Sequence, residues 1–405
     1  MLKQPKSMQL TAADLEDAVA HVGDYWKTLI RTATPSNSTL IALPHPYVVP
    51  SKGNDHFAFE EQYYWDSYFT MLGIDDEKLA AGMLDNLIFM FNQFGLIPNG
   101  NRYYFTSRSQ PPVLTSMIIH IYEKYGKSKK WLETKIEVAK KEYQHVWMSD
   151  HHPRHHMVHR GLSRYYDINH LHDLAEAASG WDMTPRFKRQ CLDYLPIDLN
   201  CLLYKYEKDF EYVADLLGKK SEARIWAYAA KERQTVVSEL MWHKRKVFFF
   251  DYNYLDDNQS NVWSLAAYFA LWSGLASDHQ AEKLVKNLSR FERKGGLTTT
   301  NGLFMYTELF GSTKTQWAYP NCWAPLQFIV VEGLEKYGYI EDAERIATTW
   351  LKTCNDWYRR HGEFLEKYNA VNPTIKPAQG LYPTQTGFGW TNGVFAYLAH
   401  KYYDV

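Results

Sequence analysis

The sequence predicts an all-α fold, and two observations lead to that prediction. Apolar side chains recur every three or four residues over most of the chain, as on the buried face of an amphipathic helix, whereas strand-like runs are few and short, the best being 247–250. Of the 405 residues, 45% are hydrophobic and 16% aromatic, which is too apolar for a disordered chain. No linker rich in Ser, Gly or Pro interrupts the chain, so we expect a single domain over residues 1–405.

The periodic segments predict the helices in order. A helix over 11–31 opens with Thr11 and Asp14, which resemble a capping box, and a helix over 76–94 is followed by Gly95, a residue that commonly ends helices. Further helical patterns cover about 112–125, 129–147, 198–217, 219–241, 260–275, 279–292, 323–337, 340–359 and 392–403.

Long segments without helical periodicity separate these helices, at 32–75, 96–111, 148–185, 293–322 and 362–391. Loops of this length are usually functional or disordered, and these are too aromatic for disorder. We therefore expect a helical scaffold whose long loops form the active-site cleft.

Charge and targeting signals exclude several classes of protein. Lys and Arg number 45 against 46 Asp and Glu, so there is no basic excess for binding nucleic acid or an anionic membrane. No run approaches the length of a membrane span and no signal peptide is visible, so we expect a cytoplasmic protein with free thiols; whether it is a monomer or a homo-oligomer is undetermined. The cysteines, none in a CxxC pair, are Cys191, Cys201, Cys322 and Cys354.

A His-rich segment over 151–159 raises the question of a metal site. It contains His151, His152, His155, His156 and His159, but no carboxylate or cysteine partner at ligand spacing. We interpret it as a polar connecting loop and expect no metal.

The loops repeat one combination of residues: Trp or Tyr beside Asp, Glu, Asn, Gln or Arg. Sugars need that mixture, because their apolar C–H faces pack on aromatic rings while their hydroxyls require paired donors and acceptors. A single Trp-Asp pair is more simply core packing with a helix cap, but five such segments together favour a sugar-binding cleft. The segments are YYWDSYF at 63–69, IPNGNR at 97–102 with SRSQPP at 107–112, SGWD at 179–182, QWAYPNCWAP at 316–325, and FLEKY at 364–368 with GFGWTNG at 387–393.

In this order the motifs resemble the trehalase family, glycoside hydrolase family 37, over roughly residues 42–400. The resemblance implies an (α/α)6 barrel with loops over one end, and inverting hydrolysis of trehalose or a related small α-glucoside by two carboxylates, without metal or cofactor. Related enzymes act on other α-glucosides with the same barrel and some of the same motifs. Two alternatives therefore remain: the protein hydrolyses another α-glucoside such as glucosylglycerate, or it is an inactive sugar-binding barrel.

The same resemblance implies a pair of catalytic carboxyl groups in this sequence. Asp182 of SGWD matches the general acid and Glu366 of FLEKY the general base, with Glu363 as a fallback for the base. An inverting enzyme needs one protonated and one ionised carboxyl about 6.5–9.5 Å apart. An adjacent Trp181 could supply the desolvation that raises the pKa of Asp182. The simpler alternatives are a helix cap for Asp182 and a surface ion pair with Lys367 for Glu366.

Sugar-binding roles follow from the same motifs. The positions expected to hold the glucosyl ring are Trp65, Asp66, Asn99 and Arg102, and those expected to complete the walls are Tyr64, Gln110, Trp181, Trp317 and Trp390. Arg102 could instead have a structural role as the partner of Asp66.

Four departures from the family pattern concern groups expected around the leaving-group sugar. Ala58 stands in place of an Arg, Ala318 in place of an Asp and Leu381 in place of a Glu, and the family's RPES segment upstream of SGWD is missing. Each lost buried polar contact costs about 1–3 kcal/mol. We therefore expect a rebuilt leaving-group side, which as a cation-lined pocket would suit an acid such as glycerate. The candidates for it are Arg164, Tyr165, His170, His172 and Arg186.

Overall fold

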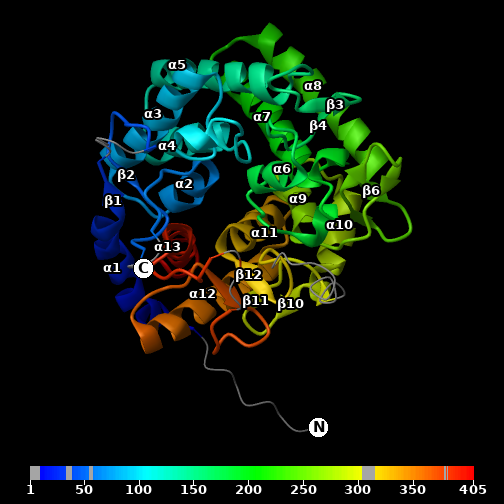
Figure 1. The fold of residues 1–405 in the computed structure, drawn as a ribbon. Helices are drawn as coiled ribbons and strands as arrows, with labels where there is room; N and C mark the ends of the chain where they lie inside the picture. The colour runs from blue at the N-terminus through cyan, green and yellow to red at the C-terminus, as the bar shows by residue number, and fades with distance from the viewer. Residues whose placement is uncertain (1–9, 33–38, 54–57, 303–314, 378–379, 381) are drawn as a thin grey trace.

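The computed structural model describes residues 10–32, 39–53, 58–302, 315–377, 380 and 382–405, and helices dominate it (Figure 1). The inner helices are α2 (Tyr64–Met71), α4 (Leu114–Lys124), α7 (Ile197–Leu216), α9 (Phe269–Ser273), α11 (Ala324–Lys336) and α13 (Gly389–Tyr403). Each of them contacts the next, and α13 contacts α2, so the ring closes.

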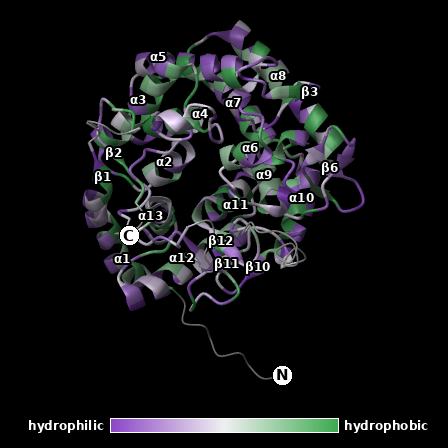
Figure 2. Ribbon diagram, in the orientation of Figure 1, coloured by the Kyte–Doolittle hydropathy of each residue, from purple (hydrophilic) through white to green (hydrophobic). Residues whose placement is uncertain are grey.

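An outer helix precedes each inner helix along the chain. The outer helices are α1 (Ala12–Leu29), α3 (Glu77–Phe94), α5 (Lys129–Glu142), α8 (Lys220–Met241), α10 (Asp278–Lys286) and α12 (Ile340–His361). Figure 1 shows them on the rim of the ring, and in Figure 2 purple and green alternate along rim helices such as α5 and α8, as expected of helices with one buried face. This double ring is the (α/α)6 barrel that the family resemblance implies.

Local sequence signals fix the ends of these helices. The Asp76 carboxylate accepts a hydrogen bond from Leu79 N at the start of α3, and Gly95 ends that helix with a φ of 69°. Ser128 caps α5 in the same way, by accepting from Trp131 N. The capping side chains satisfy amide groups that have no partner within the helix.

Two helices lie in segments that the sequence analysis assigned to loops. They are α2 and α6 (His172–Ala178). Helix α2 buries every residue except Asp66, so it lacks the alternation of apolar and polar faces that reveals a helix. The helix expected over 260–275 is also shorter, a 3-10 turn at 265–268 followed by α9, and the strand expected over 247–250 is limited to Phe248–Phe249.

The strands form small antiparallel sheets between the helices. They are β1 (Ile30–Arg31), β2 (Tyr47–Val48), β3 (Met157–His159), β4 (Leu162–Ser163), β5 (Tyr194–Leu195), β6 (Trp242–His243), β7 (Phe248–Phe249), β8 (Tyr252–Asn253), β9 (Asn258–Gln259), β10 (Glu292–Arg293), β11 (Gly296–Leu297), β12 (Asn321–Trp323) and β13 (Lys367–Asn369). The pair β12–β13 joins two distant sequence motifs, because it places Trp323 opposite Lys367 and Cys322 opposite Tyr368.

All four cysteines are buried as free thiols. Within the described part of the chain, no helix combines the length and the apolar character that crossing a membrane requires.

Candidate active site

A cavity of about 240 Å³ lies at the end of the barrel where the inner helices begin. Asp66 is in the first turn of α2, Trp390 is in the first turn of α13, and Gln110 precedes α4. The volume is below the range of about 300–1,000 Å³ typical of pockets for drug-sized ligands, and it suits one sugar ring. The lining residues are Phe59, Tyr63, Trp65, Asp66, Asn99, Phe105, Arg108, Gln110, Ala177, Gly180, Asp182, Tyr382, Phe388 and Trp390.

The floor of the cavity combines aromatic rings with amide groups. Trp65 is buried and packs edge-on against Trp390, with ring centroids 6.3 Å apart. Gly180 allows this packing, because a Cβ at that position would lie 2.8 Å from the Trp65 ring. Gln110 Oε1 accepts a hydrogen bond of 3.1 Å from Trp65 N, and Asn99 Oδ1 is buried with no partner among the described residues. A buried acceptor without a protein partner can accept a hydrogen bond from a ligand hydroxyl.

Two carboxyl groups face this cavity in a poorly solvated setting. Burial raises the pKa of Asp66 to about 8, and the charge of Asp182 adds to the effect. Burial also raises the pKa of Asp182 to about 7, followed by the charge of Glu366. No other described residue donates a hydrogen bond to either carboxyl group. Carboxyls perturbed in this way and set in a cleft are typical of functional sites.

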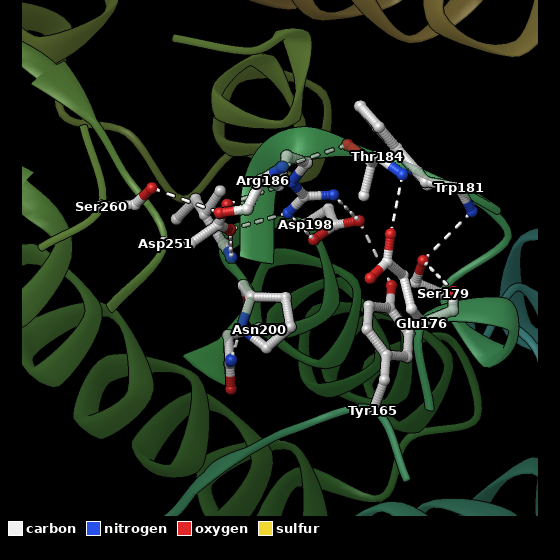
Figure 3. Close-up of polar contacts among 12 residues, drawn as sticks. Tyr165, Glu176, Ser179, Trp181, Thr184, Arg186, Asp198, Asn200, Asp251 and Ser260 are labelled. Carbon is white, nitrogen blue, oxygen red and sulfur yellow. Dashed lines mark hydrogen bonds and ion pairs between the residues drawn. The ribbon is translucent and has the colours of Figure 1, made fainter. Parts of the chain in front are cut away.

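The loop that carries Asp182 is fixed by backbone and side-chain contacts from α6 (Figure 3). Glu176 Oε1 accepts a hydrogen bond of 2.7 Å from Thr184 N, and Ser179 Oγ accepts one of 3.1 Å from Trp181 N. On the other side, Gln316 Nε2 donates to the carbonyl oxygen of Asp182 at 2.7 Å. The chain is therefore held in place on both sides of Asp182.

Behind this loop lies a buried ionic cluster. Figure 3 shows Arg186 between Asp198 and Asp251, with hydrogen bonds of 2.6–3.0 Å to the two carboxylates. The Arg186 guanidinium also lies over the Trp181 ring, 4.5 Å from its centroid. Tyr165 OH donates to Asp198 at 3.2 Å. Arg186 and Tyr165 thus support the wall and are absent from the lining of the cavity.

Glu366 is fully buried and lies outside the set of lining residues. Its Oε1 accepts a hydrogen bond of 2.6 Å from the hydroxyl of Tyr382, which does line the cavity. Its Oε2 accepts one of 3.1 Å from Lys367 Nζ, and Trp390 Nε1 donates to its backbone oxygen at 3.0 Å. Glu366 is thus held by an ammonium, a hydroxyl and an indole N–H group.

The other predicted aromatic residues lie behind the lining. Trp317 stacks on Trp323 with centroids 3.9 Å apart and contacts Trp65 and Trp181 at an angle. Tyr64 points away from the cavity, because its hydroxyl donates to Glu142 at 2.9 Å. These rings hold the floor in place without facing the cavity.

Several predicted polar residues also lie elsewhere. Arg102 pairs with Glu61, not with Asp66, and is absent from the lining. Arg164 donates from Nη1 to Leu192 O at 2.8 Å and to Tyr254 OH at 2.9 Å. The structure thus brings Trp65, Asp66, Asn99, Gln110, Asp182 and Trp390 together around the cavity.

The remaining candidates for a rebuilt leaving-group side also lie outside the lining. His172 Nδ1 accepts from Leu192 N at 3.2 Å, and His170 is exposed. The fallback base Glu363 forms an ion pair with Lys52. Of the family departures, Ala58 is exposed and Ala318 is buried, while Leu381 lies outside the described residues.

Sequence reasoning missed part of the lining. Four lining residues stood inside the quoted motifs but were given no role: Tyr63, Arg108, Gly180 and Phe388. Of these, Arg108 forms an ion pair of 3.3 Å with Asp167. The missed residues outside the motifs are Phe59, Phe105, Ala177 and Tyr382. Single aromatic residues between motifs carry no signal that separates a lining position from a core position.

The His-rich segment lies apart from this cavity. His156 is buried, its Nδ1 lies 3.0 Å from Arg164 O, and burial lowers its pKa to about 3. In the described ranges, no group of three or more His, Cys, Asp or Glu residues is arranged to hold a metal ion.

Comparison with known proteins places this geometry in a family. The family model described as Trehalase matches residues 2–173 and 166–402. Among solved structures, neutral trehalase Nth1 from Saccharomyces cerevisiae is 30% identical, and the match covers 88% of this chain and 73% of that one with a TM-score of 0.75. The GH63 mannosylglycerate hydrolase from Thermus thermophilus, solved in complex with glucose, shares the fold at 16% identity and a TM-score of 0.68, over 94% of this chain and 99% of that one. The chain therefore belongs to the trehalase family of glycoside hydrolases.

Proposed function

We propose that this protein is an inverting hydrolase of trehalose or a related small α-glucoside. The observation that carries the proposal is a pair of carboxyls in unlike environments at a cavity of one-ring size. Asp182 is poorly solvated with a raised pKa, whereas Glu366 lies between an ammonium and a hydroxyl. Two carboxyl groups in such different surroundings are suited to the separate roles of acid and base.

In this proposal Asp182 is the general acid. With its proton held to about pH 7, it gives that proton to the glycosidic oxygen as the bond to the anomeric carbon breaks. Trp65, Asn99 and Gln110 hold the glucosyl ring at the floor of the cavity, where ring faces and amide groups are both available.

Glu366 is the general base, and water adds to the opposite face of the sugar. Glu366 lies behind Tyr382, whose hydroxyl donates to Oε1 at 2.6 Å. The proton of that water therefore reaches the carboxylate by one of two routes, either directly past the Tyr382 side chain or by way of its hydroxyl. A hydroxyl can accept one proton while it donates another, so it fits either route.

The experiment that tests this function is proton NMR of the first product formed from trehalose and from other small α-glucosides. Inversion at an α-linkage releases β-glucose before mutarotation. From trehalose the leaving unit keeps its α configuration, so inversion should give α- and β-glucose in equal initial amounts. Initial release of α-glucose alone, from trehalose or from another α-glucoside, would contradict the mechanism, and a lack of turnover with every α-glucoside would favour the alternative of an inactive sugar-binding barrel.

The acid also predicts a pH dependence. Asp182 must be protonated to act, and its pKa is raised to about 7. We therefore expect kcat/KM to fall as the pH rises above about 7. A plateau that extends well above pH 8 would show that another group supplies the proton.

A further inference from the structure

Four aromatic rings line the partly exposed side of the cavity. The buried lining residues are Trp65, Asn99, Gln110, Gly180, Phe388 and Trp390, and the partly exposed ones are Phe59, Tyr63, Asp66, Phe105, Arg108, Ala177, Asp182 and Tyr382. We call Phe59, Tyr63, Phe105 and Tyr382 the aromatic mouth. A glucosyl ring held by the buried residues directs whatever is attached to it towards the exposed side, where the aromatic mouth lies.

Phe59 joins the rings of this surface. Its ring meets Tyr63 and Tyr382 edge-on, with centroids 5.8 and 5.6 Å away, and the buried Phe388 at 6.0 Å. Phe105 extends the surface from Tyr63, at 5.8 Å. The contacts form one continuous aromatic surface, and such surfaces bind apolar groups strongly.

Apart from the carboxyls of Asp66 and Asp182, the polar side chains on the exposed side of the cavity already have protein partners. Tyr382 OH donates to Glu366 at 2.6 Å and Tyr63 OH to Glu61 at 3.4 Å. Arg108, the one cation among the described lining residues, is paired with Asp167. A second sugar could pack a C–H face on these rings, but each of its hydroxyls that loses water without gaining a protein partner weakens binding.

The basic residues considered for an acidic leaving group are held elsewhere. Arg186 is enclosed by two carboxylates, and Arg164 is buried against Leu192 O and Tyr254. The described lining therefore gives an anionic leaving group no uncompensated positive charge.

We propose that the preferred leaving group has an apolar face, as a benzyl- or aryl-type alcohol does, and packs on the aromatic mouth. This inference rests on the proposed hydrolase function and names its substrate class. Asp182 gives its proton to the glycosidic oxygen, the bond from that oxygen to the anomeric carbon breaks, and water supplies the new hydroxyl, so the products are glucose and the alcohol.

The test compares benzyl α-glucoside with methyl α-glucoside, because benzyl alcohol and methanol are alcohols of similar acidity. We expect a kcat/KM at least 10-fold higher for the benzyl compound, and higher also than for trehalose and glucosylglycerate. Phe59→Ser should reduce the ratio of the benzyl to the methyl kcat/KM to less than threefold, whatever the methyl rate of the variant is, and Phe59→Leu should retain part of the benzyl advantage. Phe94→Ser, which removes a partly buried aromatic ring outside the cavity, is the matched control and should keep the full advantage.

The outcomes separate this inference from the function on which it rests. Equal rates for the benzyl and methyl compounds, or a preference for trehalose or glucosylglycerate, would overturn the inference and leave the hydrolase function intact. No hydrolysis of any α-glucoside would overturn the function. In that case calorimetric titration of the Asp182→Asn protein still decides the inference: benzyl α-glucoside should bind at least 10-fold more tightly than the methyl compound, and equal affinity would refute it.

Discussion

The two ends of the barrel both carry a cavity lined by aromatic and charged residues, but only one has the features of a catalytic site. The front cavity, where the inner helices begin, has a volume of about 240 Å³. The rear cavity lies towards their other ends and is larger, at about 500 Å³. It is lined by Tyr68, Leu72, Ser116, Ile119, His120, Glu123, Lys205, Trp272, Phe328, Glu332, Glu335, Lys336 and Tyr397.

The difference between them is how their carboxyl groups are compensated, because the rear cavity also has a buried His120 Nε2 with no partner among the described residues. At the rear, Lys205 pairs with Asp209 at 2.8 Å, Lys336 Nζ donates to a backbone carbonyl at 2.9 Å, and Glu332 accepts from Tyr397 OH at 3.1 Å. At the front, the carboxyls of Asp66 and Asp182 have no hydrogen-bond donor from another described residue. Cavity size therefore does not mark the site, whereas desolvated carboxyls left for a ligand do.

The largest expected effect comes from replacing a carboxyl at each end. Asp182→Asn should reduce kcat on any active α-glucoside by about 10²–10⁴-fold, because general acid catalysis contributes that much. Glu332→Gln, which keeps an acceptor for Tyr397 at the rear cavity, is the matched control and should keep kcat within twofold. Steady-state kinetics check both variants, and similar losses in the two would remove the distinction between the ends.

Asp66→Asn should have the next largest effect. The loss of this carboxyl as a hydrogen-bond partner for a sugar hydroxyl costs about 1–3 kcal/mol, or roughly 5–150-fold in kcat/KM. An unchanged kcat/KM would show that Asp66 does not contact the substrate.

The unfolding free energy of the Asp66→Asn variant should increase, relative to that of the wild type, as the pH rises. The pKa of Asp66 rises from 3.8 to about 8 on folding, so between these values the folded state holds a proton that the unfolded state has lost. The unfolding free energy of the wild type therefore falls with rising pH in that window, and the Asn variant lacks this loss. Thermal denaturation should show a larger advantage for Asp66→Asn at pH 8 than at pH 5.

A smaller effect is expected from the support of the acid loop. Glu176→Ala removes the acceptor for Thr184 N, and we expect a loss of about 1–3 kcal/mol in unfolding free energy together with a fall in kcat of roughly 10-fold as Asp182 loses its position. Glu176→Gln keeps an oxygen at that position and should stay within about threefold of the wild-type kcat. Equal losses in the two variants would mean that the charge of Glu176, not its hydrogen bond, matters.

The smallest effect is expected at the rear cavity. Partial burial and the neighbouring Lys205 lower the pKa of Lys336 to about 8, but this side chain is exposed enough for solvent to screen its charge. Lys336→Met should leave kcat, KM and the unfolding midpoint near their wild-type values. A clear loss of activity would show that the rear cavity is coupled to the site.

Much of the fold was accessible from the sequence because outer helices are amphipathic. Periodic apolar residues identified α1, α3, α8 and α12 to within a few residues, and Gly95 marked the end of α3. Helix α2 was not predicted because almost every one of its residues is buried. A helix enclosed on all sides has no polar face, so its sequence lacks the alternation of apolar and polar residues that indicates a helix.

For the site, the sequence alone determined which family the motifs resemble and which carboxyls we propose as acid and base, because Asp182 and Glu366 stand in short, distinctive segments. Only the tertiary structure decided which side chains meet in the cavity. Strand pairing between β12 and β13 brings two distant motifs together, and packing turns Tyr64, Arg102 and Arg186 towards Glu142, Glu61 and two buried aspartates. The direction of a side chain depends on partners far away in the sequence, and no local pattern records those partners.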